Sequence, residues 1–185
     1  MKFHNLKKYR FVLEPRYYFF GWKSSSEIVA RASAIAALLR ARKFLPKGYN
    51  FKIWDAQRDR RVQILMAKSF VKRLKLADPK NYKKLLLKFA GSNTNPPQKI
   101  TRLDTHRNGG AFDCTIVDKN GTELWMGTDH DDLTERAALA YYENKKKLTA
   151  LEAEAKKNRR LLARAMTKAG FSAYAPEWWH WSYKK

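Results

Sequence analysis

Apolar positions along the first half of the chain predict helices packed against a strand. Residues 27–43, 60–76 and 82–89 place apolar side chains three and four positions apart, which is the spacing of a helix with one buried face. Residues 50–55 alternate polar and apolar side chains, a pattern typical of a short strand. We therefore expect three helices, with the strand between the first two.

The second half predicts a hairpin followed by a long helix. Residues 111–117 and 123–126 are interpreted as two strands, because the dipeptide Asn120-Gly121 between them is typical of tight hairpin turns. Residues 133–169 return to helical spacing and end at Gly170, a residue common just beyond helix C-termini.

Both ends of the chain are aromatic and lack a helical period. Residues 1–22 and 173–183 suit extended structure laid across a core. Together these elements predict one α+β domain spanning residues 1–185, with helices packed on a small antiparallel sheet.

Charge sets this chain apart from an ordinary small domain. It has 39 Lys and Arg against 17 Asp and Glu, a formal net charge of +22 over 185 residues. Residues 68–88 hold eight basic residues and one acidic, and residues 145–168 hold nine and two. Two interpretations of these helical stretches stay open: solvated helix faces, or a surface for polyanions such as nucleic acid or acidic lipid.

Composition also excludes several classes of protein. A content of 44% hydrophobic and 14% aromatic residues predicts a packed core rather than a disordered basic tail. The single cysteine, Cys114, excludes a disulfide framework. No apolar run approaches the ~18–20 residues that cross a bilayer, and the N-terminus does not resemble a secretory signal. We expect a cytoplasmic protein in which Cys114 is a small buried hydrophobe.

The acidic residues cluster. Eight of the 17 lie between positions 104 and 135. In a strongly basic chain, such a cluster indicates either a bound cation or a site for a positively charged part of a substrate.

Two of the four histidines lie in patterns that suit a metal. His106 precedes Asp113 by seven positions, and Gly109-Gly110 between them permits a sharp bend. His180 follows Glu177 by three positions. Two histidines and a carboxylate can hold zinc and leave a fourth position for water, which a glutamate could deprotonate. The alternative to a metal site is that His106 is an ordinary loop histidine and His180 is part of an aromatic cluster.

These residues also match a known pattern. His106-x-x-Gly109-x-Ala111-x-Asp113 followed by Glu177-x-x-His180 resembles the paired motif of the zinc D-Ala-D-Ala metallopeptidases, in particular the VanX-type D-alanyl-D-alanine dipeptidases. The segments 54–58 and 125–131 are similar to further landmarks of that family, in the same order along the chain. The resemblance covers about residues 10–183.

The resemblance implies a zinc site on the sheet of a hedgehog or DD-peptidase-like fold, with one Zn²⁺ per chain. It implies that three residues hold the metal: His106, Asp113 and His180. Glu177 would then be the general base, and Arg58 would stabilise the oxyanion that forms from the peptide carbonyl.

The resemblance also implies substrate contacts. Asp131 would bind the free α-ammonium of a dipeptide, and Tyr17 would help to close the pocket. The chain departs from the family at Asp104, where a serine near the substrate is usual, and at His130, which is usually aromatic. Asp104 could shift specificity, and His130 could compete as a ligand.

The function expected from this resemblance is zinc-dependent hydrolysis of D-alanyl-D-alanine to two D-alanines, with a small dipeptide as partner. Two alternatives stay open. One is a peptidoglycan endopeptidase or DD-carboxypeptidase of the same superfamily. The other is a nucleic-acid-binding module that uses the basic helices, although no base-reading motif supports it. The sequence does not predict an oligomeric state.

Overall fold

A five-stranded sheet forms the centre of the molecule. The computed structural model describes residues 2–90 and 105–184. In spatial order the strands are β2 (Val12–Leu13), β4 (Asn50–Asp55), β5 (Ala111–Val117), β7 (Glu177–Ser182) and β6 (Ser172–Tyr174). Neighbouring strands are antiparallel except β2, which runs parallel to β4 at the edge. The predicted α+β class is confirmed.

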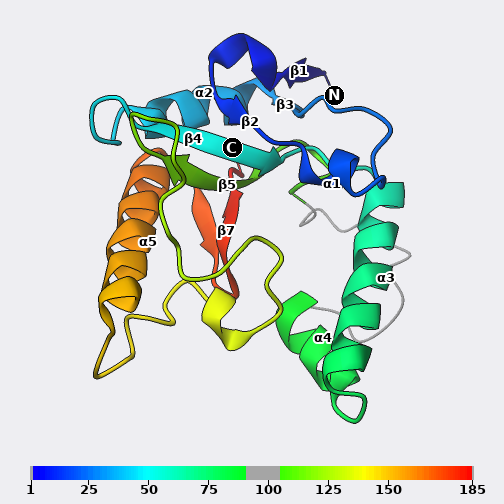
Figure 1. The fold of residues 1–185 in the computed structure, drawn as a ribbon. Helices are drawn as coiled ribbons and strands as arrows, with labels where there is room; N and C mark the ends of the chain where they lie inside the picture. Colours follow the sequence, from blue (N-terminus) through cyan, green and yellow to red (C-terminus); the bar gives the residue numbers. More distant parts are fainter. Residues whose placement is uncertain (1, 91–104, 185) are drawn as a thin grey trace.

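The helices lie on different sides of this sheet. They are α1 (Arg16–Phe19), α2 (Ala32–Arg42), α3 (Arg60–Ala77), α4 (Tyr82–Ala90) and α5 (Ala150–Lys168), with short 3₁₀ turns at Leu6–Tyr9 and Glu135–Ala137. In Figure 1, α5 lies on one side of the sheet and the α3–α4 pair on the other, with α1 next to the start of α3. Among the described residues, no helix is both long and apolar enough to cross a membrane.

The first predicted helix begins five residues later than expected. Val29–Arg31 forms strand β3, which pairs with β1 (Phe3–Asn5) in a small antiparallel sheet, and α2 starts only at Ala32. Helical periodicity cannot detect this pairing, because a distant segment supplies the hydrogen bonds of β3.

Two predictions in the second half need a similar correction. The expected helix over 133–169 is limited to α5. At its start the Thr149 side chain accepts a hydrogen bond from Glu152 N, and the Thr149 backbone N–H donates one to the Glu152 carboxylate. The expected strand over 123–126 is reduced to a single bridge between Val117 and Glu123. The segment between this bridge and α5 is mostly turns.

Strand alternation separates the core from the candidate site. Phe112 and Cys114 of β5 belong to the main core cluster, together with Leu38 of α2 and Met166 of α5. Asp113 lies between these two residues and points to the opposite face of the sheet. The predicted burial of Cys114 away from the metal ligands is thus confirmed.

Candidate metal centre

The sheet and one loop bring the three predicted ligands together. Asp113 on β5 is the direct antiparallel partner of His180 on β7. His106 arrives from the turn before β5, where Gly109 has φ +68° and accepts a hydrogen bond from Arg31 N at 3.0 Å. A Cβ at Gly109 would lie 2.7 Å from the ring of Phe3, so the close approach of this turn requires glycine.

The three ligand atoms form a compact triangle. His106 Nε2 and His180 Nδ1 each lie 3.2 Å from Asp113 Oδ1, and the two nitrogens are 3.0 Å apart. A tetrahedral zinc with bonds of about 2.0–2.1 Å separates its ligands by about 3.3 Å. Asp113 Oδ1 is buried and lacks a hydrogen-bond partner among the described residues. The donor set and its spacing therefore fit zinc.

Hydrogen bonds on the far side of each imidazole orient the lone pairs inward. His106 Nδ1 lies 2.6 Å from the carbonyl oxygen of Ala56, and His180 Nε2 lies 3.0 Å from Ser182 Oγ. Ser182 Oγ in turn lies 2.8 Å from Thr105 Oγ1. A ring nitrogen that donates a proton outward leaves the other nitrogen free to bind a metal. Burial also lowers the pKa of His180, which favours the neutral imidazole.

Arg58 is held by two buried carboxylates beside this triangle. Its Nε donates to Asp55 Oδ2 at 2.8 Å and its Nη2 donates to Asp113 Oδ2 at 2.7 Å. Burial would lower the pKa of Arg58, but the charge interactions with Tyr17, Asp55 and Asp113 outweigh it and raise this pKa. Arg58 is therefore a fixed cation adjacent to the ligand carboxylate.

Tyr17 connects Arg58 to Asp131. The Tyr17 hydroxyl donates to Asp131 Oδ2 at 3.1 Å and accepts from Arg58 Nη2 at 3.3 Å. Tyr17 is 1% exposed, so it lies inside the site rather than at its mouth. Asp131 has φ +60°, and this uncommon left-handed conformation sets the direction of its carboxylate.

Glu177 begins strand β7, three residues before His180, and is partly buried. Burial raises the pKa of Glu177 well above its usual range, and the negative charges of Asp113 and Asp131 raise it further. A carboxyl group with a raised pKa suits proton transfer near neutral pH.

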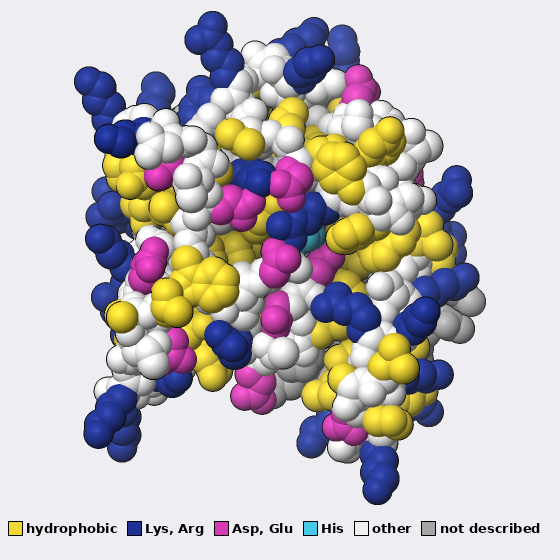
Figure 2. Space-filling view, viewed as in Figure 1, with side chains coloured by type: hydrophobic (Ala, Val, Ile, Leu, Met, Phe, Trp, Pro, Cys, Tyr) yellow, Lys and Arg dark blue, Asp and Glu magenta, His cyan; other side chains and the backbone are white. Residues whose placement is uncertain are grey.

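Acidic groups outnumber basic ones around the site. The carboxyl groups are Asp55, Asp113, Asp131 and Glu177. Among the described lysines and arginines, Arg58 pairs with Asp55 and Asp113, and Lys23 pairs with Asp55. Figure 2 shows acidic side chains gathered around a hollow in which a histidine is visible. Negative charge concentrated within a chain of net charge +22 favours a bound cation.

Comparison with known proteins agrees with this geometry. A family model described as D-ala-D-ala dipeptidase matches residues 21–185. The chain belongs to this family of peptidases. The match includes the three candidate ligands, Arg58, Asp131 and Glu177.

Three curated family members illustrate the similarity, each named D-alanyl-D-alanine dipeptidase. The protein from Escherichia coli K12 is 36% identical over 81 residues, and that from Synechocystis is 33% identical over 81 residues. These matches cover 44% and 42% of this chain, but 38% and 33% of the two relatives. The Enterococcus faecium protein is 27% identical over 164 residues, which is 84% of this chain and 73% of that relative.

Two of the predicted site positions remain outside this arrangement. Asp104 lies outside the described residues. His130 is buried with its Nε2 3.6 Å from Asp113 Oδ2 and 3.5 Å from Asp131 Oδ1, but the ligand cluster found among the described residues comprises only His106, Asp113 and His180. Both ring nitrogens of His130 are buried and lack a hydrogen-bond partner among the described residues, and its role as a competing ligand stays a prediction.

Several supporting residues of this family member were not predicted. Asp55 pairs with Arg58, and the hydroxyl groups of Ser182 and Thr105 orient His180. Asp55 could have been found from the sequence, because its carboxylate ends a predicted strand three residues before Arg58. The hydroxyl pair joins residues 77 positions apart, so only the fold reveals it.

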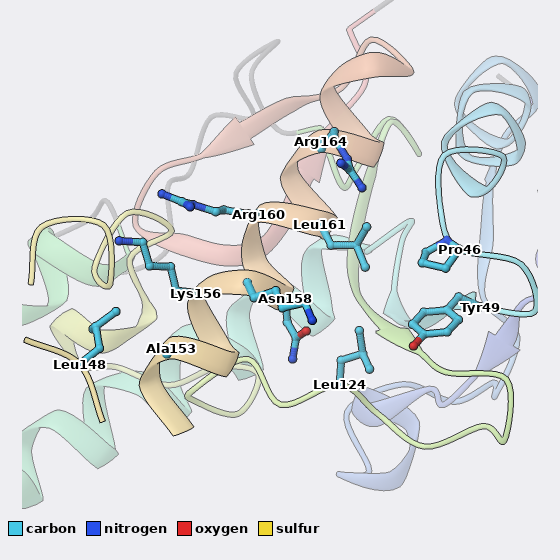
Figure 3. A pocket seen from close by; sticks show the side chains of 11 residues that line it. Pro46, Tyr49, Leu124, Leu148, Ala153, Lys156, Asn158, Arg160, Leu161 and Arg164 are labelled. Atoms are coloured by element: carbon cyan, nitrogen blue, oxygen red, sulfur yellow. The ribbon is translucent and has the colours of Figure 1, made fainter. Parts of the chain in front are cut away.

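A separate pocket lies along α5, away from these residues. It has a volume of about 590 Å³, and Pro46, Tyr49, Leu124, Leu161 and Arg164 are among its lining residues. Figure 3 shows Tyr49 and Leu161 facing each other across it. No candidate catalytic or ligand residue is among the described side chains that line this pocket.

Proposed function

We propose that this chain is a zinc-dependent dipeptidase that hydrolyses D-alanyl-D-alanine to two D-alanines, and that residues 1–185 form one catalytic domain. The observation that carries the proposal is the triangle of His106 Nε2, Asp113 Oδ1 and His180 Nδ1, with edges of 3.0–3.2 Å and a buried oxygen without a hydrogen-bond partner among the described residues. Family membership supports the reaction class. A cytoplasmic location stays a prediction.

His106, Asp113 and His180 would hold the zinc. When bound, zinc supplies a Lewis acid for the scissile carbonyl and lowers the pKa of an attacking water from 15.7 to about 7. Glu177 accepts a proton from that water and then donates it to the leaving amino group, a double role that its raised pKa favours.

Arg58 stabilises the negative charge that develops on the carbonyl oxygen. Its guanidinium is already fixed by Asp55 and Asp113, so little reorganisation is needed as the charge forms. Removing a donor of this kind typically lowers kcat by about 10²–10³.

Asp131 binds the free α-ammonium of the substrate, and Tyr17 holds the Asp131 carboxylate in place. Recognition of this charged end favours free dipeptides over longer, internally cleaved chains. Asp104 is proposed to lie near the substrate and to tune specificity, in the position where the family usually has serine.

The test is a turnover assay on free D,D- and L,L-dipeptides and on intact sacculi, combined with metal analysis of the same samples. We expect zinc-dependent cleavage of D-Ala-D-Ala that chelation removes and zinc restores. Glu177→Ala should abolish turnover while zinc stays bound. Cleavage of sacculi without cleavage of free dipeptide, or loss of zinc from Glu177→Ala, would contradict the proposal.

A further inference from the structure

Three consecutive aromatic residues are exposed on and just after helix α1. Tyr18, Phe19 and Phe20 are 42%, 66% and 54% exposed, and we call them the α1 aromatic cluster. With about 200 Å² per aromatic side chain, the exposed area is about 300 Å². This is comparable to the largest apolar patch on a typical monomer, about 300–600 Å², and the largest patch is often functional.

The cluster is held rigidly outward. Tyr17, on the same helix, points inward and stacks on Trp22 with ring centroids 5.4 Å apart. Phe20 also contacts Trp22, with ring centroids 5.2 Å apart, and its ring lies 6.4 Å from that of Tyr17. Gly21 makes the turn between them with φ +70°. Because these inward contacts fix α1, the cluster cannot bury itself by a small side-chain rotation.

A basic surface adjoins the cluster. Tyr17 shares an apolar cluster with Val62 and Met66 of α3, so α1 rests on the first half of that helix. Exposed cations continue along α3 and α4: Lys68, Lys72, Arg73, Lys75, Lys83 and Lys84. Residues 68–88 contain a single acidic residue, Asp78. In Figure 2, hydrophobic side chains gather beside the acidic hollow, with Lys and Arg further out on the same side.

We propose that the α1 aromatic cluster and the basic α3–α4 surface dock the protein onto the surface of an anionic lipid bilayer. Aromatic rings are stable at the headgroup level, and Lys and Arg are attracted to anionic lipids and extend their charges toward them. Neither feature alone anchors a protein firmly, but the two together supply apolar burial and electrostatic attraction.

Charge and chemistry favour this occupant over two others. A second copy of the chain also carries a charge of +22, so pairing through this side would be opposed by repulsion. Duplex nucleic acid would engage the lysines through its phosphates and leave Phe19 and Phe20 exposed, whereas a bilayer surface buries such rings and also attracts the lysines. A single strand, whose bases could stack on the rings, is an outcome of the test. This inference does not depend on the proposed peptidase activity.

The test is cosedimentation of the purified chain with vesicles of equal parts phosphatidylglycerol and phosphatidylcholine, compared with phosphatidylcholine alone. We expect binding to the anionic vesicles, weaker binding as salt rises, and at least about tenfold weaker binding for the double variant Phe19→Ser/Phe20→Ser. The matched control is Phe44→Ser/Leu151→Ser, two exposed apolar residues elsewhere (40% and 63% exposed), which should bind like the parent chain.

A second arm tests the charges. Lys72→Glu/Lys83→Glu should weaken vesicle binding by at least about 25-fold, since each basic residue near an anionic surface contributes about fivefold. Dipeptide turnover of Lys72→Glu/Lys83→Glu should stay at the parent level, which separates this proposal from that of the enzyme. Two binding results would overturn the docking proposal: equal binding to neutral and anionic vesicles, or unchanged binding of Phe19→Ser/Phe20→Ser. It would also be overturned if the chain preferred nucleic acid to vesicles, or if the variants raised the KM for dipeptide without changing vesicle binding.

Discussion

The hydroxyl pair behind His180 shows how single residues shape the candidate metal centre. Ser182 Oγ contacts His180 Nε2 at 3.0 Å and Thr105 Oγ1 at 2.8 Å, and Thr105 directly precedes the ligand His106. The pair therefore orients one imidazole and also fastens the two histidine-bearing segments to each other.

Ser182→Ala should weaken zinc binding by about 10–100-fold, because His180 loses the partner that fixes its tautomer and ring orientation. Ser182→Thr should restore most of the affinity. The measurement is competition with a chelator of known affinity, and Thr115→Val is the control, since Thr115 on β5 is buried without a hydroxyl partner among the described residues. Equal affinity of Ser182→Ala and the parent chain would remove this role.

Glu177 predicts a pH dependence of stability in the metal-free protein. Its folded-state pKa lies well above the ordinary 4.5. The contribution of the protonated carboxyl to stability is therefore fully present below pH 4.5 and is lost as pH rises from 4.5 through the raised pKa. Glu177→Gln should therefore gain stability relative to the parent chain by about 1.4 kcal/mol for each pH unit within that window. Urea unfolding with chelator from pH 5 to 8 measures this, and a difference that is independent of pH would refute it.

Asp131 should affect one class of substrate selectively. Asp131→Ala should lower kcat/KM for free D-Ala-D-Ala by at least about tenfold, because the ammonium loses its charged partner. The kcat/KM for the N-acetylated dipeptide should fall much less. Parallel assays on the two substrates decide the point, and equal losses would show that Asp131 acts on the fold or on the metal instead.

At the scale of elements, the loop that carries Asp131 is attached to α5. Arg159 donates from Nε to Met126 O at 2.7 Å, from Nη1 to Ala138 O at 2.7 Å and from Nη2 to Arg136 O at 2.8 Å. Burial lowers the pKa of Arg159 to about 10. One buried cation thus satisfies three loop carbonyls and links the helix to the substrate site.

Arg159→Met should lower the free energy of unfolding by about 3 kcal/mol, since three carbonyls lose a charged donor. It should also raise the KM for dipeptide, because the loop around Asp131 is released. Arg160→Met is the control. Arg160 is exposed and pairs with Glu143 on the surface, so its loss should lower the urea midpoint far less than Arg159→Met does. Similar urea midpoints for the two variants would contradict this account.

Local signals predicted some elements well and others poorly. The strand over 50–55 and α3 agree with the sequence, because alternation and the Asp59 cap are encoded by neighbouring residues. The predicted start of α2 was wrong because a distant strand, β1, pairs with the residues before it. The predicted helix before α5 was wrong because this segment is held by hydrogen bonds from Arg159, which is distant in the sequence.

At the scale of the whole molecule, the charge is segregated. Carboxylates surround the candidate site, while lysine and arginine occupy the outer helices (Figure 2). The family resemblance selected three candidate ligands that the structure brings together, because Asp113 and His180 lie on paired strands. Neither Asp55 nor Ser182 was predicted. The position of Asp55 three residues before Arg58 was a usable signal, whereas the contact of Ser182 with Thr105 depends on the three-dimensional fold.

The most direct test is the zinc content of the purified chain and of His106→Ala, Asp113→Ala and His180→Ala, each confirmed as folded by circular dichroism. The triangle of ligand atoms predicts one zinc per parent chain and little or none in each variant. A folded parent chain without affinity for zinc, or variants that retain one equivalent, would contradict the account.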